Sequence, residues 1–235
     1  MGRTVAGELE AALSRLFEET VKITGAGRTD TGVHASGQVI SFKTARSFPF
    51  DRLDLALGAE LPHDISVRDV AIAQGGFSAR FSARERTYVY LILNRRARSA
   101  LLAHRAYHVY RDELDLEAMR AAAAPLRGEH DFRSFCGTLP ESGVTVREVR
   151  DLSIERAGDI VRIQIRADGF LHRMVRTVVG TLVECGLRRR DPDSVAEILA
   201  ARDRRVAGLT APPHGLYLAG VRYDDYDSYR EPPAL

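Results

Sequence analysis

The stretch RTYVYLILN, residues 86–94, decides how the rest of the chain must be arranged. Its apolar side chains would alternate between the two faces of an extended chain and fill both of them: Tyr88, Tyr90 and Ile92 on one, and Val89, Leu91 and Leu93 on the other. A strand that is apolar on both faces has to be covered on both faces. The stretch therefore predicts a central strand within a sheet.

Helical and extended patterns occur on both sides of this strand. Apolar residues recur at helical spacing in five segments: residues 7–17, 50–62, 114–128, 170–186 and 191–201. Gly186 fits the position after a helix end, and Asp191 with Pro192 fits a helix start. Shorter extended patterns are found at residues 21–23, 38–44 and 215–223, and residues 146–167 alternate as a hairpin around Gly158. The polar tail, residues 224–235, is expected to be loosely held.

The mixture of a hairpin with helices favours an α+β fold, in which helices pack on one side of an antiparallel sheet, over a doubly wound parallel fold. The two halves of the chain have a similar content of elements. We therefore predict two similar α/β subdomains, residues 1–100 and 101–235, with no sequence repeat to prove their relationship.

Composition limits the class of protein. The chain has 235 residues, of which 45% are hydrophobic and 28% charged, as in ordinary globular proteins. No apolar run is long enough for a membrane span, and residues 1–13 lack the apolar core of a secretory signal. Cys136 and Cys185 lie far apart and form no CxxC pair, so a reducing cytoplasm is the expected compartment.

Basic residues are concentrated in two arginine-rich segments, although the net charge is only +2. The first segment contains Arg80, Arg84, Arg86, Arg95, Arg96, Arg98, Arg105 and Arg111, and the second contains Arg162, Arg166, Arg173, Arg176, Arg188, Arg189 and Arg190. Such segments fit a polyanion lying across one face of the protein. They equally fit solvated arginines in a chain that prefers arginine to lysine.

One carboxylate, Asp30, stands among small residues in TGAGRTDTGVHASGQV, residues 24–39. Small neighbours allow a bulky substrate to come close to the backbone. An aspartate beside threonine and glycine also commonly caps a turn or a helix. The residues by themselves leave both readings of Asp30 open.

Familiar chemical motifs do not account for this loop. A dinucleotide fingerprint needs glycine where Asp30 stands, and a nucleoside-triphosphate loop needs lysine where Val33 stands. The histidines lack paired metal-ligand spacing, and no serine sits in a GxSxG elbow. We therefore expect surface or structural roles for His34, His108, His130, His172 and His214.

The segment GAGRTDTGVHASGQVISF, residues 25–42, closely resembles the catalytic segment of the tRNA pseudouridine synthase A family, whose pattern reads GxGRTDxGVHAxxQ. Four further segments resemble family motifs in the same order, and together they cover most of the chain: RERTYVYLILN, HDFRSFC, DGFLHRMVRTVVG and APPHGLYLAGVRY.

The resemblance implies a role for each matching residue. Asp30 would be the catalytic acid, Tyr88 would stack on the target base, and Arg176 would form an ion pair with Asp30. Leu216 would wall the pocket beside Tyr88, and Arg28 would help to open the base stack and hold the RNA. The resemblance also implies the pseudouridine synthase fold, in which two α/β subdomains share an antiparallel sheet with the active cleft between them.

The same resemblance implies a cytoplasmic homodimer without cofactor or metal that isomerises uridine at positions 38, 39 and 40 in the anticodon stem–loop of tRNA. The reaction replaces the bond from ribose C1′ to N1 by a bond from C1′ to C5. An ionised carboxylate would attack C1′ or remove the C2′ proton, and the sequence does not choose between these routes. Either route needs the target base out of its stack and received by an aromatic surface.

One departure from the family pattern lies at the N-terminus. Family members begin with a strand and a GWQ-type loop, whereas here the chain starts MGRTVAGELE. A missing strand would leave unpaired strand edges. The sequence thus raises two expectations: a start codon further upstream, or a tRNA-binding, chaperone-like protein with little turnover.

Overall fold

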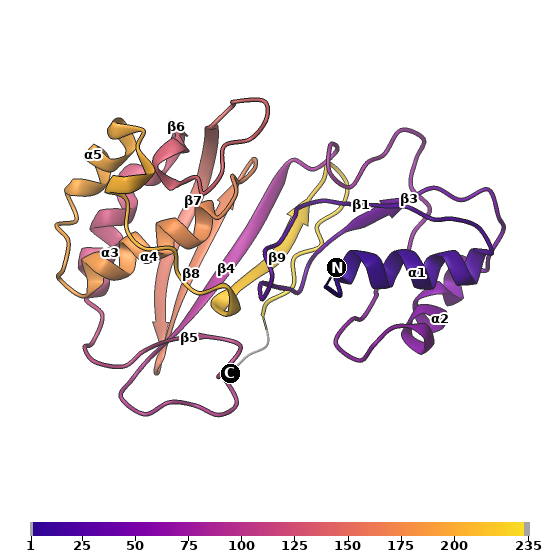
Figure 1. Ribbon diagram of the computed structural model, residues 1–235, viewed down its shortest axis with the longest axis horizontal. Coiled ribbons are helices and arrows are strands. Elements are labelled where there is room, and N and C mark those ends of the chain that lie inside the picture. Colours follow the sequence, from indigo (N-terminus) through magenta and orange to yellow (C-terminus); the bar gives the residue numbers. More distant parts are fainter. Residues whose placement is uncertain (1, 233–235) are drawn as a thin grey trace. The chain divides into compact units, whose positions relative to one another are not determined.

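The computed structural model describes residues 2–232 (Figure 1). Its contacts divide the chain into two compact units. The first unit comprises the chain up to Arg28 and Val39–Ala83, and the second comprises Thr29–Gln38 and Arg84–Leu235. The loop that contains Asp30 therefore belongs to the second unit, together with the central strand.

The first unit packs two helices and a small sheet around one apolar core. Helix α1 (Val5–Phe17) begins at Thr4, whose hydroxyl accepts the N–H of Gly7. Strands β1 (Ile23–Gly25) and β3 (Ile40–Phe42) pair antiparallel. The 3₁₀ turn η1 (Phe50–Arg52) leads into α2 (Leu53–Glu60). The buried core residues are Leu9, Ala12, Leu13, Phe17, Val21, Leu53, Leu57 and Leu61.

The second unit is built on a seven-stranded sheet. Its strands follow the order β2 (His34–Ala35), β9 (Leu216–Arg222), β4 (Glu85–Asn94), β8 (Ile160–Ala167), β7 (Val146–Ala157) and β6 (Gly128–Asp131), and β5 (Tyr107–Val109) pairs with β4. Neighbours pair antiparallel except β2 with β9 and β4 with β5. The sheet is mixed and mainly antiparallel.

Helices cover one face of this sheet, where α3 (Leu116–Ala123), α4 (Met174–Gly186) and α5 (Ser194–Ala201) lie together (Figure 1). Short 3₁₀ turns complete the unit: η2 (Ala124–Leu126), η3 (Phe132–Phe135), η4 (Arg204–Val206) and η5 (Pro213–Gly215). The other face of β4 packs in a second cluster of buried residues: Val89, Leu91, Leu93, Leu102, Ala106, Tyr217 and Ala219. Both faces of the stretch 86–94 are therefore covered, as its sequence predicts.

Two helix ends differ from the sequence expectations. Gly186 is the last residue of α4, and the left-handed residue that follows is Arg188, with φ of 56°. A side chain at position 186 would come within 2.8 Å of Met119, so close packing against α3 explains that glycine. Helix α5 is preceded by Asp193, whose side chain makes no capping hydrogen bond. Asp191 instead closes a turn before the helix, accepting the N–H of Asp193 on Oδ1 and that of Ser194 on its carbonyl.

Residues 224–232 of the polar tail are tied to the sheet, contrary to expectation, and residues 233–235 lie outside the described residues. Ser228 is buried and its hydroxyl donates to the carbonyl of Gly37 at 2.6 Å. The backbone of Asp227 pairs with that of Arg222 in an isolated antiparallel β-bridge, and the N–H of Arg230 donates to the carbonyl of Ala219. Ordered backbone pairing outweighs the polar composition of this segment.

The predicted α+β class is confirmed: the chain is mixed α/β with a mainly antiparallel sheet and helices on one side of it. Strands β1 and β3 form a separate two-stranded sheet in this structure. The contact-based units also differ from the predicted subdomains 1–100 and 101–235, because β4 belongs with the strands of the second half. The subdomain boundary near residue 100 stays a prediction. No helix within residues 2–232 is long and apolar enough to cross a membrane.

Candidate active site

Asp30 occupies the first position of a tight turn in the second unit. The N–H of Val33 donates to the carbonyl of Asp30 at 3.0 Å, and Gly32, two residues after Asp30, has φ of 83°. This is the conformation that a type II turn requires at its third residue. A side chain at position 32 would also approach the ring of Pro213 to 3.1 Å. The turn explains the glycine and leaves the carboxylate of Asp30 for other contacts.

Arg176 holds one oxygen of that carboxylate. Its Nη1 donates to Oδ2 of Asp30 at 2.5 Å, and its Nε donates to the carbonyl of Ala211 at 2.8 Å. The N–H of Ala211 returns a hydrogen bond to the carbonyl of Arg176. The side chain of Arg176 is only 12% exposed, against 26% for Asp30. The planar guanidinium therefore fixes the carboxylate against the first turn of α4.

His172 approaches the other oxygen of the same carboxylate. Its Nε2 lies 3.5 Å from Oδ1 of Asp30, and its side chain is 40% exposed. Sequence reasoning missed this residue, because a lone histidine without metal-ligand spacing gave no signal. The available signal was its position four residues before Arg176, since the turn that opens α4 brings both side chains to one carboxylate.

Glycine packing supports the backbone around His172. The N–H of Gly137 donates to the carbonyl of His172 at 2.8 Å. A side chain at position 137 would come within 3.1 Å of Nδ1 of His172 and of Cδ of Arg173. Arg173 itself is left-handed, with φ of 59°. The segment HDFRSFC, residues 130–136, and the glycine that follows it therefore support the backbone next to the site.

Tyr88 lies on β4 and is 7% exposed. Its ring meets that of Phe170 edge to face, with centroids 5.0 Å apart. Burial, together with the nearby charge of Asp30, raises the pKa of Tyr88 to about 12. Tyr88 thus remains a protonated hydroxyl at neutral pH, which can donate a hydrogen bond and is a poor base.

Leu216 and Arg28 occupy different surroundings. Leu216 is buried on β9 and pairs across the ladder with Tyr90, so it is the diagonal neighbour of Tyr88 on the same face. Arg28 is exposed at the end of the first unit's opening segment, and its predicted role in holding RNA remains a prediction. The structure thus brings Asp30 together with Arg176 and His172, and its charge also acts on Tyr88.

The second arginine-rich segment is largely neutralised by acids. Five of its seven arginines form ion pairs, with partners Glu231, Asp151, Asp30, Asp115 and Glu184. Because a paired guanidinium contributes less to attraction of a polyanion, this segment is less basic than its composition indicates. Among the described residues, no group of three His, Cys, Asp or Glu is placed to hold a metal ion.

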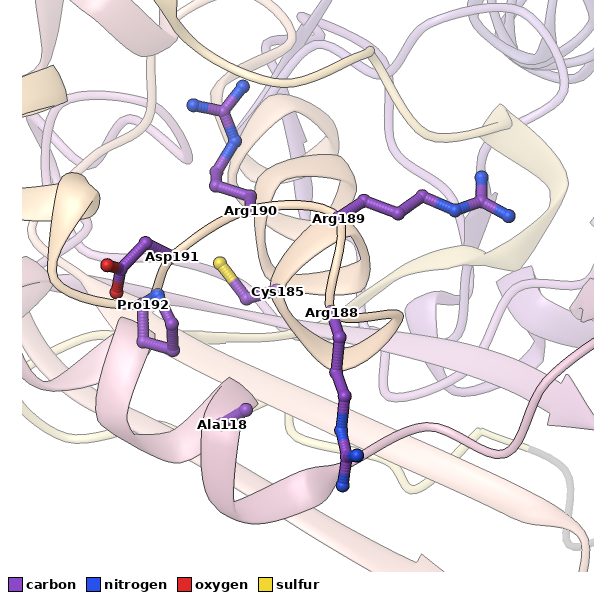
Figure 2. A pocket seen from close by; sticks show the side chains of 7 residues that line it. All are labelled: Ala118, Cys185, Arg188, Arg189, Arg190, Asp191 and Pro192. Carbon is purple, nitrogen blue, oxygen red and sulfur yellow. The ribbon is translucent and has the colours of Figure 1, made fainter.

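A cavity of about 370 Å³ lies at the far end of α4 (Figure 2). It is lined by Ala118, Cys185, Arg188, Arg189, Arg190, Asp191 and Pro192. Helix rise places this end, at Gly186, about 15 Å from Arg176 along α4. Arg188 is paired with Asp115 and Arg190 with Glu184, so little unbalanced charge faces the cavity. The cavity is therefore separate from the Asp30 site.

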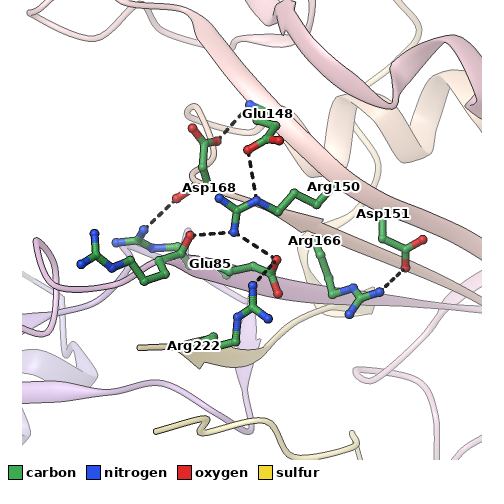
Figure 3. A network of polar contacts seen from close by, with 9 residues as sticks. Glu85, Glu148, Arg150, Asp151, Arg166, Asp168 and Arg222 are labelled. Atoms are coloured by element: carbon green, nitrogen blue, oxygen red, sulfur yellow. Dashed lines mark hydrogen bonds and ion pairs between the residues drawn. The ribbon is translucent and has the colours of Figure 1, made fainter. Parts of the chain in front are cut away.

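A second arginine-bound carboxylate lies on the sheet. Oε2 of Glu85 accepts hydrogen bonds from Arg150 and Arg222, each at 3.3 Å, and Arg150 also binds Glu148 (Figure 3). Glu85 is only 5% exposed. Arg222 lies on the neighbouring strand β9, whereas Arg150 lies on β7, beyond β8, so this carboxylate links β4 to β7 and β9.

The second unit thus combines an α+β fold with a turn-borne carboxylate that a helix arginine orients. A comparison with known protein families gives the class of protein: the model of the tRNA pseudouridine synthase family matches residues 2–82 and 122–224. The chain belongs to this family.

Curated relatives are similar over most of their length. The chain is 46% identical to tRNA pseudouridine synthase A of Halalkalibacterium halodurans over 91% of this chain and 81% of the relative. It is 44% identical to tRNA pseudouridine synthase A of Bacillus subtilis over 95% of this chain and 91% of the relative. It is 46% identical to tRNA pseudouridine synthase A of Moorella thermoacetica over 94% of this chain and 90% of the relative.

Proposed function

We propose that this protein is an isomerase that converts uridine to pseudouridine in tRNA, at positions 38, 39 and 40 of the anticodon stem–loop, and that it works in the cytoplasm as a homodimer. Family membership and the names of its relatives support the tRNA substrate and the reaction. One structural observation supports the assignment of the chemistry: the carboxylate of Asp30 is fixed through Oδ2 by Arg176 and remains partly exposed.

Asp30 acts on the ribose of the target uridine. Its carboxylate attacks C1′ or removes the C2′ proton, and both routes need an ionised oxygen beside the sugar. The guanidinium of Arg176 binds the carboxylate and holds its orientation. The turn containing Gly32 carries no bulky side chain, so the ribose can approach Asp30.

Tyr88 and Leu216 form the wall that receives the base. Stacking of a flipped base on an aromatic ring contributes about 1–3 kcal/mol. Because the hydroxyl of Tyr88 stays protonated at neutral pH, it serves as a hydrogen-bond donor to the uracil or the sugar. Arg28 contributes to opening the stack and holding the RNA strand.

Release of tritium from uridine C5 tests the proposal. Transfer RNA labelled with tritium at C5 loses the label as C5 forms its bond to C1′. The wild-type protein should release tritium and Asp30→Asn should not, and mapping of pseudouridine in the product should find it at positions 38–40. Equal release by both proteins would refute the role of Asp30. Binding of tRNA without any release would instead favour a tRNA-binding protein without turnover.

A further inference from the structure

The proposed isomerisation requires a proton to leave C5. When C1′ has moved from N1 to C5, C5 carries both its hydrogen and the new bond to ribose. The electron pair of the C5–H bond then forms the C5=C6 double bond, the C6=N1 pair returns to N1, and N1 takes up a proton. The net change is one proton transferred from C5 to N1, so the site needs a group that accepts the C5 proton.

The position of that group follows from the bond just formed. C5 is then one covalent bond from C1′, the atom beside which Asp30 must lie. The base that removes the C5 proton therefore lies close to Asp30. Arg176 and His172 contact the carboxylate of Asp30, and the charge of Asp30 also acts on Tyr88, which makes these three side chains the candidates.

Two of these three are unsuitable as bases. The guanidinium of Arg176 stays protonated, offers no acceptor, and already uses Nη1 and Nε for Asp30 and Ala211. The hydroxyl of Tyr88 is buried, and its pKa is raised to about 12. A neutral imidazole, in contrast, has an acceptor nitrogen and exchanges protons readily near neutral pH.

His172 also has the required geometry. Its Nε2 faces Oδ1 of Asp30 at 3.5 Å, the oxygen that Arg176 does not hold. Its side chain is 40% exposed, so it can reach a bound nucleotide and exchange protons with water. The hydrogen bond from Gly137 and the close packing of that glycine fix the backbone from which the ring projects.

We infer that His172 is a catalytic residue that accepts the C5 proton on Nε2 after the C1′–C5 bond has formed. This inference rests on the proposed function. The ring enters the step neutral, with its hydrogen on Nδ1, and leaves it as an imidazolium beside the carboxylate of Asp30. The imidazolium then returns its proton to N1 or to water, which restores the starting state.

A deuterium isotope effect tests the assignment. Transfer RNA is prepared with hydrogen or deuterium at C5 of the target uridines, and kcat is measured for wild type and His172→Gln. Glutamine keeps a polar side chain of similar length beside Asp30 but cannot accept the proton. We expect kcat of His172→Gln to fall about 10²–10⁴-fold, with unchanged tRNA affinity and a primary isotope effect larger than that of wild type. The variant His130→Gln, at a partly buried histidine that contacts the carbonyl of Arg127, is the matched control.

Imidazole rescue provides the second measurement. Added imidazole should raise the turnover of His172→Ala, because the small molecule can occupy the vacated, partly exposed position. A slow His172→Gln without an increased isotope effect, or a His172→Ala that imidazole does not rescue, would show that the residue only orients Asp30. If the wild type turns over and His172→Gln is equally fast, the inference about His172 is refuted and the proposed function stands. If the wild type does not turn over, both are refuted.

Discussion

Asp30 and Glu85 are both carboxylates bound by arginine, yet they differ in the number of arginines that bind them and in their exposure to solvent. Oε2 of Glu85 is shared between two arginines at 3.3 Å, and the residue is 5% exposed. Oδ2 of Asp30 has one short contact with Arg176, and its side chain is 26% exposed. Glu85 holds three strands together, whereas Asp30 sits on a turn with an oxygen directed to a partly exposed histidine.

The comparison shows that an ion pair alone does not identify a catalytic carboxylate. Removal of one partner from a buried pair leaves an uncompensated charge, so the Glu85 network acts on stability. A carboxylate on a turn of small residues contributes little to packing and remains open to a substrate. Substitutions at the two positions should therefore separate activity from stability.

The largest expected effect is on turnover at Asp30. Asp30→Asn should lower pseudouridine formation by more than about 10³-fold, because an amide cannot act as the ionised nucleophile or base. The matched variant Glu85→Gln should keep kcat within a few-fold of wild type wherever it is folded. Tritium release measures the turnover of both variants, and circular dichroism measures the fraction of each that is folded. A similar loss of turnover in the two variants would mean that Asp30 and Glu85 do not differ in catalytic role.

Arg176→Lys should have the next largest effect. A lysine can reach either Asp30 or the carbonyl of Ala211 but lacks the planar fork that binds both, so the carboxylate loses its fixed orientation. We expect kcat to fall about 10²-fold while KM changes little. Arg150→Lys is the control in the Glu85 network and should leave kcat nearly unchanged. A larger change in KM than in kcat would indicate that Arg176 binds tRNA instead.

Substitutions of Tyr88 separate stacking from hydrogen bonding. Tyr88→Leu removes the aromatic surface and should weaken tRNA affinity by about 1–3 kcal/mol. Tyr88→Phe keeps the ring and should preserve affinity while slowing turnover. Binding titrations and single-turnover rates distinguish the two effects, and full activity of Tyr88→Leu would exclude the stacking role.

Glu85→Gln should lower the free energy of unfolding by about 1–3 kcal/mol, because Arg150 and Arg222 lose their shared anion. Asp30→Asn should cost less stability, since its side chain is more exposed. Urea unfolding of the three proteins gives the values. The reverse order of stabilities would mean that the Asp30 pair is the structural one.

The dependence of protein stability on alkaline pH should also depend on Tyr88. The pKa of Tyr88 is raised to about 12 in the folded state by burial and by Asp30, against about 10 in an unfolded chain. Between these values the unfolded chain releases a proton that the folded protein retains, so stability falls as pH rises, by up to about 1.4 kcal/mol per pH unit. Tyr88→Phe should reduce this slope by one proton. The exposed Tyr110→Phe is the control, and an unchanged slope in Tyr88→Phe would contradict the burial argument.

Much of the fold was predictable because its signals are local. Alternation at residues 86–94 and 146–167 corresponds to β4, β7 and β8, and helical periodicity corresponds to α1, α3 and α4. The errors arose where tertiary contacts replaced a local rule. Gly186 packs against Met119 instead of taking the left-handed position after the helix end, which Arg188 occupies. Residues of the polar tail pair with the sheet through Ser228.

The candidate site divides in the same way. The residues of the Asp30 loop, together with the motif that they match, determined which carboxylate to examine and which family the chain resembles. The resemblance named Arg176 as the partner of that carboxylate, but only the folded chain gives the contact itself, because Arg176 lies 146 positions away and reaches Asp30 through the start of α4. His172 lies four positions before Arg176, but only the folded chain brings its Nε2 within 3.5 Å of Oδ1, the approach on which its chemistry depends.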